Sequence, residues 1–406
     1  MTILPGMSGH TLDQDAEVII VGGGPAGLAL ACALDAAGIA PLVLEQQPLE
    51  PLRVPAEDGR DIALTYRSRR VLESLGIWQR LPDAEVSPLR EARVVDEGPA
   101  PELQIAPVAN GDGPLGWLVP NHCIRRAVLE EFERRELRLE CDSRVTRFER
   151  GAGQAAVVLA DGRRFSAPLV VAADSRFSEV RRMAGIGAQM RDFGHTALVG
   201  RIAHERDHGG IAWECFRHGC TLALLPLNGR QVSGVITVTT DAAPEWCGLD
   251  DRSYAERVAA RSPAGFGAMR TAGPRHRYPL VAVYAHTFAA PRFALVGDAA
   301  VGMHPVTAHG YNLGLYGVEV LARELAAAQR CGRDPGSMEV LASYAREHHR
   351  VSMPIYHGTN AIVRLFTHDR GPALAARRLV LAASQHLPLF GRLVRSAIRN
   401  RLTSAA

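Results

Sequence analysis

The sequence predicts an α/β fold in which a parallel-sheet domain carries an inserted α+β part with an antiparallel sheet and ends in a helical C-terminal tail. Three observations lead to this prediction: a strand, glycine turn, helix and strand near the N-terminus, alternating apolar runs between residues 196 and 240, and a helical pattern beyond Pro335. The 406 residues suffice for two or three domains. With 47% hydrophobic and 22% charged residues, the composition is globular and excludes collagen, coiled-coil and disordered classes.

The composition also excludes several functions. The sequence contains no lysine, so all 46 residues counted as lysine or arginine are arginines. Schiff-base catalysis and the Walker A loop both need a lysine, which excludes pyridoxal enzymes and P-loop ATPases. The seven cysteines form no C-x-x-C pair, so we expect neither a zinc ribbon nor a disulfide framework, and a reducing compartment. A net charge of +3 argues against a nucleic-acid partner.

The N-terminal region predicts a cytoplasmic protein. The first fifteen residues have neither a cationic start nor an apolar core, which argues against a secretory signal. The most apolar window, Gly27 to Leu44, is interrupted by Asp35 and Gly38. It is more typical of a buried helix and strand than of a membrane span.

The first structural signal is the apolar, β-branched run from Glu17 to Val21, which predicts a central parallel strand. The glycine turn that follows opens an Ala/Leu-rich helix ending before Gly38. Residues 41–45 predict a second strand, which completes a βαβ unit.

The turn itself has the form Gly22-x-Gly24-x-x-Gly27, the dinucleotide-binding fingerprint. Gly22 would make the tight turn, Gly24 would let a pyrophosphate approach the backbone N–H groups, and Gly27 would allow close helix packing. Glu45, at the end of the second strand, is placed to accept hydrogen bonds from ribose hydroxyls. FAD and NAD use the same cradle, so these residues alone leave the nucleotide open.

The remaining elements follow from local patterns. The sequence predicts helices over 66–75, 121–135 and 312–329, a hairpin within 157–173 around Asp161-Gly162, antiparallel strands over 220–227 and 232–238, a buried strand over 293–297, and helices beyond Pro335 with breaks at Gly371 and Pro388.

The strand over 293–297 would deliver Asp298 at its carboxyl edge, where ligands gather in open α/β sheets. A Pro/Gly-rich turn containing His304, Pro305 and His309 then leads to a helix that starts near Gly310. The partial positive charge of that helix start would stabilise an anionic reduced flavin ring. The alternative is an ordinary strand, loop and helix with a surface aspartate.

Residues 297–314 resemble the G-D-A-A-H-x-x-x-P-x-x-G-x-G-x-N-x-G segment of the FAD-dependent aromatic hydroxylases. Asp174 to Arg181 is similar to their A-D-G-x-x-S-x-x-R motif, whose aspartate lies near the flavin pyrophosphate. The resemblance implies an FAD-binding Rossmann-like domain in which Pro305, Gly310 and Asn312 also contact FAD. It further implies a class A flavoprotein monooxygenase, in which a flavin C4a-hydroperoxide transfers oxygen to a phenol without a metal.

Within that class, the chain looks like the ubiquinone-biosynthesis hydroxylases. Asp58 to Trp78 is similar to their D-x-R-x-x-A-L…L-G-x-W stretch, and Ala212 to Leu227 to their A-x-E-x-F…L-A-L-L-P-L segment. By this resemblance Arg60 faces FAD. The string from Asp298 to Gly310 is most like the bacterial branch that hydroxylates demethoxyubiquinol at the 5-position.

The resemblance also implies the partners: a prenylated aromatic substrate, O2, and NAD(P)H or a protein electron donor, with other ubiquinone-biosynthesis proteins as further candidates. Five positions depart from the family patterns. They are Ser175 in place of glycine, Val301 in place of histidine, His309 in place of glutamine, Gly317 in place of aspartate, and His122 where relatives often have arginine.

Candidate residues for the reaction lie on the predicted antiparallel sheet and at the flavin edge. Phe216, Leu225 and Pro226 are candidates for an apolar wall that shields the flavin from water, although core packing would explain them equally well. Glu214, His304 and His309 are candidates for binding or deprotonating the phenol, with Pro305 beside them; a structural hydrogen bond is the alternative. We expect His348 and His349 to lie on the surface.

The C-terminal tail is basic and amphipathic. Eight arginines and only one carboxylate, Asp369, lie between Arg364 and Arg401. Apolar residues at helical spacing from Leu389 to Leu402 predict a helix that either lies peripherally on the inner membrane surface or packs on the enzyme.

The sequence thus predicts a discontinuous FAD-binding domain (1–75, 115–190 and 275–335), a substrate domain (76–114 and 191–274) and a helical region (336–406). Two alternatives to a hydroxylase stay open at this point. One is a flavin-dependent reductase of an isoprenoid lipid, and the other is a non-catalytic flavin-holding member of a biosynthetic assembly.

Overall fold

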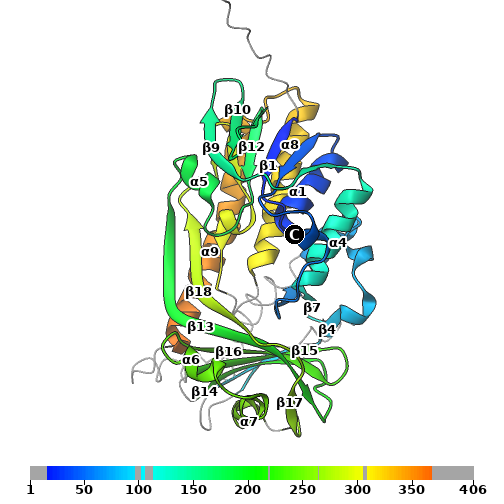
Figure 1. Cartoon of the computed structure of the whole chain (residues 1–406), viewed down its shortest axis with the longest axis vertical. Helices are drawn as coiled ribbons and strands as arrows, with labels where there is room; N and C mark the ends of the chain where they lie inside the picture. The colour runs from blue at the N-terminus through cyan, green and yellow to red at the C-terminus, as the bar shows by residue number, and fades with distance from the viewer. Residues whose placement is uncertain are drawn as a thin grey trace, which may run out of the picture.

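The computed structural model describes residues 16–96, 102–105, 113–217, 220–263, 265–304 and 309–367. Figure 1 shows an elongated molecule with a parallel sheet and its helices at one end and an antiparallel sheet at the other. Two long strands, β13 (Ala188–His204) and β18 (His276–Ala285), run between the two ends. The predicted domain boundaries near residues 190 and 275 therefore fall at these two strands.

The parallel sheet has the strand order β19-β20-β12-β1-β2-β8. Its strands are β1 (Val18–Val21), β2 (Pro41–Leu44), β8 (Arg138–Glu140), β12 (Leu169–Ala172), β19 (Ala289–Ala290) and β20 (Phe293–Leu295). Every residue of β1, β2, β12 and β20 is buried. Because both faces of such strands are covered, their sequences are continuously apolar and do not alternate with polar residues. The predicted strands at 17–21, 41–45 and 293–297 are confirmed.

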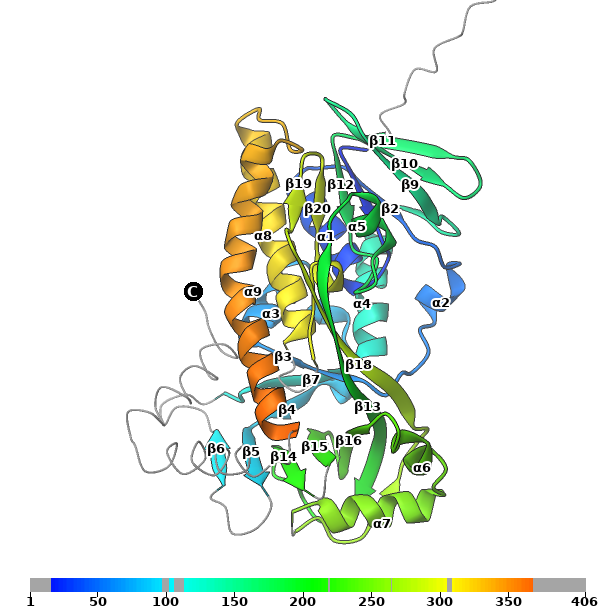
Figure 2. The ribbon, with the colours of Figure 1, turned by 90° about the vertical axis from the view of Figure 1, so that its left-hand side faces the viewer.

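Helices pack on this sheet and on one another. They are α1 (Pro25–Ala36), α3 (Tyr66–Ser74), α4 (Asn121–Arg134), α8 (Gly310–Arg330) and α9 (Met338–Thr367), with the short α2 (Glu50–Arg53) and α5 (Glu179–Met183). Helix α1 packs on α4 and α8, and α8 packs on α9. Figure 2 shows α9 running beside α8 along the molecule. The predicted helices at 66–75, 121–135 and 312–329 are confirmed.

The prediction over 157–173 is correct only in part. Strands β10 (Ala155–Leu159) and β11 (Arg164–Ala167) form the hairpin, and β9 (Val145–Arg150) adds a third antiparallel strand. Residues 169–172, however, belong to the central parallel sheet as β12. Pro168 separates the two runs, and a proline cannot donate a hydrogen bond to continue the hairpin ladder.

The second large sheet follows the order β21-β18-β13-β16-β15-β14-β5-β6, with β17 paired to β13. Its other strands are β5 (Glu91–Asp96), β6 (Leu103–Ile105), β14 (Ile211–Arg217), β15 (Cys220–Leu227), β16 (Gln231–Thr239), β17 (Met269–Thr271) and β21 (Val301–Gly302). Strands β13 to β16 and β18 are antiparallel neighbours, as the alternating pattern predicts.

The two faces of this sheet meet different partners. On the outer face, Leu224 and Ile236 pack in one cluster with Trp246 of α6 (Ala243–Cys247) and Tyr254 of α7 (Asp251–Arg261). The inner face meets a small third sheet made of β3 (Asp61–Leu64), β7 (Gly116–Pro120) and β4 (Ser87–Leu89). This third sheet therefore lies between the large antiparallel sheet, which carries the predicted substrate residues and is called the substrate sheet below, and the nucleotide-binding part.

A buried ionic cluster joins the helices of the nucleotide-binding part. Glu131 of α4 is 1% exposed, and its carboxylate accepts hydrogen bonds from Arg80, Arg134 and Arg135 at 2.6 to 2.9 Å. Arg135 also donates to the carbonyl of Leu75 at 2.9 Å. These contacts fix α4 against α3 and the turn that follows it.

Helix α9 contains Pro354 within its 30 residues. The predicted breaks at Gly371 and Pro388 and the amphipathic helix from Leu389 to Leu402 lie outside the described residues. Among the helices that the structure describes, none is both long enough and apolar enough to cross a bilayer.

Candidate flavin site and substrate face

Four predicted motifs meet at one edge of the parallel sheet. Asp298 follows β20, Asp174 follows β12, Gly22 follows β1 and Glu45 follows β2. These four strands are parallel neighbours, so their carboxyl ends share an edge. The sheet order thus brings together residues as far apart in sequence as Gly22 and Asp298.

The glycine turn has the geometry of a dinucleotide cradle. Gly22 has a φ of +116°, and a Cβ atom there would lie 2.5 Å from the carbonyl oxygen of Ala173. A Cβ at Gly27 would lie 2.0 Å from the carbonyl oxygen of Gly22, so only glycine allows α1 to pack this closely. At Gly24 a Cβ would meet nothing within 4 Å. The turn is therefore closed towards the protein at Gly22 and Gly27 and open at Gly24, which fits a bound pyrophosphate.

Glu45 lies beside this turn. Its Oε2 accepts a hydrogen bond from the Gly23 N–H at 2.6 Å, and its Oε1 accepts one from the Gln47 N–H at 2.8 Å. Each carboxylate oxygen has a second lone pair, so the group can still accept ribose hydroxyls.

Asp174 lies beside the start of the short helix α5. It accepts hydrogen bonds from the Ser178 hydroxyl at 2.5 Å and from the Val180 N–H at 3.2 Å. Burial raises the pKa of Asp174, and these hydrogen bonds oppose the rise. Arg181, only 2% exposed, donates to the carbonyl of Ala299 at 2.8 Å. This hydrogen bond fixes the motif from Asp174 to Arg181 to the segment that contains Asp298.

Arg176 makes a contact that sequence reasoning missed. Its guanidinium donates to Asp298 Oδ2 at 2.9 Å and to the carbonyl of Val281 on β18 at 3.1 Å. No local pattern signals a pair separated by 122 positions. The neighbouring Ser175 has a φ of +95°, a conformation that favours the glycine found there in the family motif.

The start of α8 lies next to the same edge. A Cβ at Gly314 would lie 3.4 Å from the Cα of Gly297, so the helix approaches the Asp298 turn closely. Asn312 is engaged with the protein itself: its amide donates to the carbonyl of Ala63 at 2.8 Å and accepts from the Thr65 N–H at 3.1 Å. Asn312 therefore attaches α8 to the end of β3. Gly310 is the first residue of α8, where a Cβ would meet nothing within 4 Å, and His309 is buried before it.

Arg60 lies at the junction of the two large sheets. Its guanidinium pairs with Asp58 at 2.5 Å and lies 5.4 Å from the ring centre of Tyr278 on β18. Asp58 also accepts a hydrogen bond from the Asn121 side chain at 2.7 Å. Arg60 remains 45% exposed, so it is available to a ligand.

The inner face of the antiparallel sheet holds most of the predicted substrate residues. Alternate residues of a strand share a face, which places Ala212, Glu214 and Phe216 together on β14. In the antiparallel pairing of β14 with β15, Trp213 is opposite Leu224. One step further along the register, Leu225 is therefore opposite Ala212 and lies on the same face. Ala212 packs with Leu225 in one apolar cluster, which confirms the shared face.

Pro226 does not belong to this wall, contrary to the prediction. It pairs with Val232, whose side chain is in the outer cluster, and it lies between the inward-facing Leu225 and Leu227. The period of two in a strand puts adjacent residues on opposite faces, so Leu225 and Pro226 cannot both face the flavin side.

Glu214 is a carboxyl group in apolar surroundings. No described cation pairs with it, and burial raises its pKa to about 8. It is consequently protonated near neutral pH and able to donate a hydrogen bond.

His304 is a weaker base than the sequence suggests. It is 5% exposed, and its ring meets Phe193 edge-on at 4.9 Å between centres. Burial, with a smaller contribution from the charge of His195, lowers the pKa of His304 to about 4. The imidazole is therefore neutral at pH 7. Pro305 lies outside the described residues.

The prediction that His348 lies on the surface is wrong. It is 0% exposed, and its Nδ1 is 3.0 Å from the Tyr344 hydroxyl. A Cβ at Gly317 would lie 2.6 Å from the His348 ring. The imidazole fills the space that the aspartate common at position 317 would need, so tertiary packing buries a helical histidine that looks exposed in sequence.

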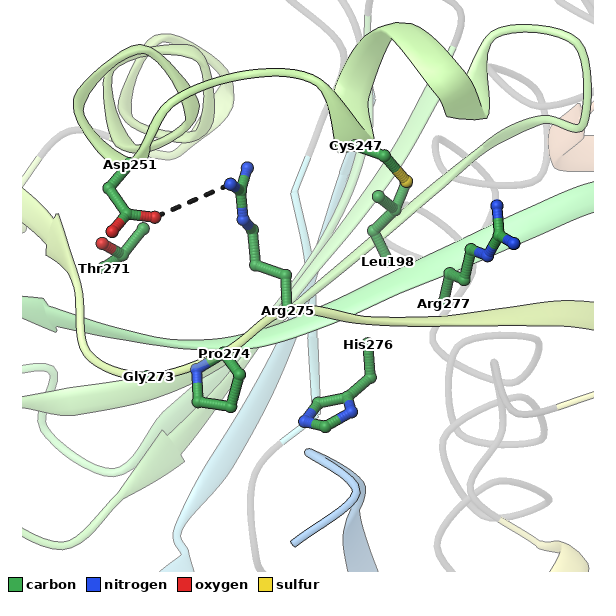
Figure 3. Close-up of a pocket in the computed structure, with 9 residues that line it drawn as sticks. All are labelled: Leu198, Cys247, Asp251, Thr271, Gly273, Pro274, Arg275, His276 and Arg277. Carbon is green, nitrogen blue, oxygen red and sulfur yellow. Dashed lines mark ion pairs between the residues drawn. The ribbon is translucent and has the colours of Figure 1, made fainter.

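A separate pocket of about 690 Å³ lies at the outer face of the antiparallel sheet. Figure 3 shows Arg275 between β18 and α7, paired with Asp251 at 3.6 Å, and Arg277 and Cys247 nearby. None of the nine residues that line it is a predicted site residue. Leu198 places it on the side of the sheet opposite to Leu225.

Comparison with known proteins gives one consistent assignment. Residues 15–359 match the family model described as FAD binding domain. The chain is 38% identical to ubiquinone hydroxylase UbiM of Neisseria meningitidis, over 95% of this chain and 85% of that protein. It is also 38% identical to ubiquinone hydroxylase UbiL of Rhodospirillum rubrum, over 94% of this chain and 89% of that protein.

Among solved structures, the chain is similar to p-nitrophenol 4-monooxygenase PnpA of Pseudomonas putida. The TM-score is 0.75, the identity is 17%, and the match covers 96% of this chain and 99% of that one. This likeness supports the α/β fold with its antiparallel insertion.

Proposed function

The chain belongs to the FAD-binding-domain family that includes the ubiquinone hydroxylases, and on that premise we propose that it hydroxylates the aromatic ring of a prenylated phenol or quinol precursor of ubiquinone. FAD is its cofactor, and it is an FAD-dependent monooxygenase that uses O2 and a reductant on a small aromatic substrate. The observation that carries the proposal is the convergence of four motifs at one sheet edge.

The residues at this edge would hold FAD. The open turn at Gly24 would receive the pyrophosphate, Glu45 a ribose, and Asp298 the polyol chain. The other proposed contacts are Gly22, Gly27, Arg60, Asp174, Gly310 and Asn312. Once reduced by a nicotinamide or protein donor, bound FAD supplies the activation of O2.

The inner face of the antiparallel sheet would hold the substrate ring. Phe216 and Leu225 supply apolar surface that excludes water. Glu214, protonated near neutral pH, would donate a hydrogen bond from its carboxyl group to a ring oxygen. His304 would act as a neutral hydrogen-bonding group and His309 as a positioning group at the start of α8.

The proposal is tested with the purified, FAD-loaded protein, a reduced nicotinamide and a short-chain prenylated phenol. We expect oxygen uptake that depends on the phenol and a product heavier by one oxygen atom. NAD(P)H oxidation with saturation of a prenyl double bond and no oxygen incorporation would instead identify a reductase. A flavin that neither nicotinamide nor a protein donor reduces would identify the scaffold alternative. The quinone precursor that accumulates in a deletion strain would name the ring position.

Two further expectations belong to this proposal. We propose an FAD-binding domain made of residues 1–75, 115–190 and 275–335, a substrate domain made of residues 76–114 and 191–274, and a C-terminal helical region over residues 336–406. We also infer that the basic tail contacts anionic lipid, because the substrates of such hydroxylases carry prenyl chains. Deleting residues 388–406 should reduce co-sedimentation with anionic vesicles while FAD stays bound; unchanged co-sedimentation would contradict a lipid-binding tail.

A further inference from the structure

Asp61 is a buried carboxylate without a hydrogen-bonding partner among the described residues. It begins β3, directly after Arg60. Both of its carboxylate oxygens are buried, and neither receives a hydrogen bond from the part of the chain that the structure describes. A buried acceptor in this state costs free energy unless another molecule donates to it.

Ser233 on β16 is in the same state. It is 0% exposed, and its hydroxyl makes no hydrogen bond to the described protein. The Ser233 hydroxyl acts as a weak hydrogen-bond donor that lowers the pKa of Asp61, but the geometry of this contact is too poor to satisfy either group. Two unpartnered polar groups therefore adjoin each other between two different sheets.

The register places both groups on the flavin-side face of the substrate sheet. Ser233 pairs with Leu225, which faces inward, so Ser233 faces inward too. Ala63 shares a face of β3 with Asp61, and it packs against Leu227 and Leu225 of the substrate sheet. Asp61 and Ser233 thus lie beside the apolar surface that would receive the ring.

Asp61 is also close in the chain to the flavin edge. Two residues after it, the carbonyl of Ala63 accepts the hydrogen bond from Asn312 that attaches the start of α8. Strand β3 therefore lies between the start of α8 and the substrate sheet.

The charges around Asp61 do not supply its missing partner. Arg201 on β13 is the cation that faces it, but Arg201 pairs with Glu85 at 3.4 Å. Burial, which is the main cause, together with the charges of Glu85 and Asp58, raises the pKa of Asp61 to about 6. Near neutral pH the group is therefore mostly an anion able to accept a strong hydrogen bond.

We infer that Asp61 and Ser233 form the polar subsite that binds a hydroxyl group of the aromatic substrate. The surroundings suit this ligand: two carboxylate oxygens and one hydroxyl adjoin Ala63, Leu225 and Leu227, which match an apolar ring carrying an OH group. The inference rests on the proposed function, because it names where that substrate's hydroxyl is held.

The test compares FAD-loaded wild type with Asp61→Asn, Ser233→Ala and the control Asp161→Asn, whose carboxylate lies in the exposed β10–β11 turn. The probes are 2-methoxyphenol and 1,2-dimethoxybenzene, which lacks the hydroxyl, and binding is read from the flavin absorption spectrum. We expect the wild type to bind the phenol about tenfold more tightly at pH 7.5 than at pH 5, and more tightly than the dimethoxy compound.

Asp61→Asn should weaken phenol binding about tenfold at pH 7.5, remove its pH dependence and leave the affinity for the dimethoxy compound unchanged. Ser233→Ala should weaken phenol binding and keep the pH dependence. Asp161→Asn should behave as wild type. FAD content and thermal unfolding of each variant show that it is folded.

Equal phenol affinity and pH dependence in Asp61→Asn and wild type would overturn the inference, as would a wild type that does not bind the phenol. Product analysis distinguishes a failure of this inference from a failure of the proposed hydroxylase function. Hydroxylation by the wild type with no effect of Asp61→Asn on binding removes only the inference. Binding that depends on Asp61, without any oxygen incorporation, removes only the hydroxylase proposal.

Discussion

Glu131 is buried and Glu214 is partly buried, and their surroundings shift the pKa values of the two carboxyl groups in opposite directions. Three arginines bond to Glu131 in the nucleotide-binding part and lower its pKa to about 2. No described cation pairs with Glu214 on the substrate face, and burial raises its pKa to about 8. At pH 7 the Glu131 carboxyl group is therefore ionised, and the Glu214 carboxyl group is mostly protonated and neutral.

The flavin edge and the substrate face also differ in how far their polar groups are hydrogen-bonded within the protein. At the flavin edge, Asp174, Asp298 and Asn312 all have hydrogen-bond partners within the protein. On the substrate face, Asp61 and Ser233 have none among the described residues. The protein thus fixes the cofactor edge with internal bonds and leaves polar groups for a ligand on the other face.

The largest effect should come from the glycine turn, where two glycines differ in their surroundings. Gly27→Ala places a Cβ 2.0 Å from a backbone oxygen and should destabilise the fold by roughly 3 kcal/mol or more. Gly24→Ala meets no protein atom within 4 Å, so it should keep the melting temperature of the FAD-free protein and weaken FAD binding. Thermal unfolding and the flavin absorption near ~450 nm measure the two effects. Equal stability of the two variants would contradict the close approach at Gly27.

Glu131→Gln should destabilise the protein by about 3 kcal/mol at pH 7, because three guanidinium groups lose their buried anion. A lowered pKa means that this stability is present above the unfolded-state pKa near 4.5 and is lost as the pH falls towards 2. Urea unfolding at pH 7 and pH 3 measures the change. A difference from wild type that does not shrink at pH 3 would count against the ionic explanation.

Glu214→Gln should stabilise the folded protein at high pH, whereas Glu131→Gln should destabilise it at pH 7. Because the pKa of Glu214 is raised to about 8, wild type loses stability as the pH rises from about 4.5 to 8, while the glutamine variant does not. We therefore expect the variant to be more stable than wild type by up to about 5 kcal/mol at pH 9 and equally stable at pH 4. It should also hydroxylate more slowly while keeping its FAD. Unfolding curves of both proteins at pH 9 and pH 4 measure this difference in stability. A variant less stable than wild type at pH 9 would show that the Glu214 carboxylate has a stabilising partner.

The smallest effect concerns Ser175, which has a φ of +95° beside Asp174. Ser175→Gly should relieve backbone strain and stabilise the protein by at most about 1 kcal/mol, since part of the gain is offset by the greater freedom of glycine in the unfolded chain. The melting temperature measures it. As a control, Ser178→Gly should destabilise, because it removes the cap of α5.

Much of the flavin edge could be predicted from sequence because its signals are local. The run from Val18 to Val21, the glycine turn and Glu45 lie within one βαβ unit, and Gly22 and Gly27 are required by close backbone contacts. The substrate face was harder to predict. Leu225 and Pro226 are adjacent and both apolar, and only the pairing register separates their faces.

The sequence by itself determined the parallel strands, the glycine turn and the family, because short-range sterics and motif spacing define them. The tertiary structure decided which side chains acquire partners: Arg176 meets Asp298, His348 fills the space beside Gly317, and Asp61 is left beside Ser233. The physical reason is that burial and pairing depend on contacts between residues more than 30 and up to about 170 positions apart, which no local pattern encodes.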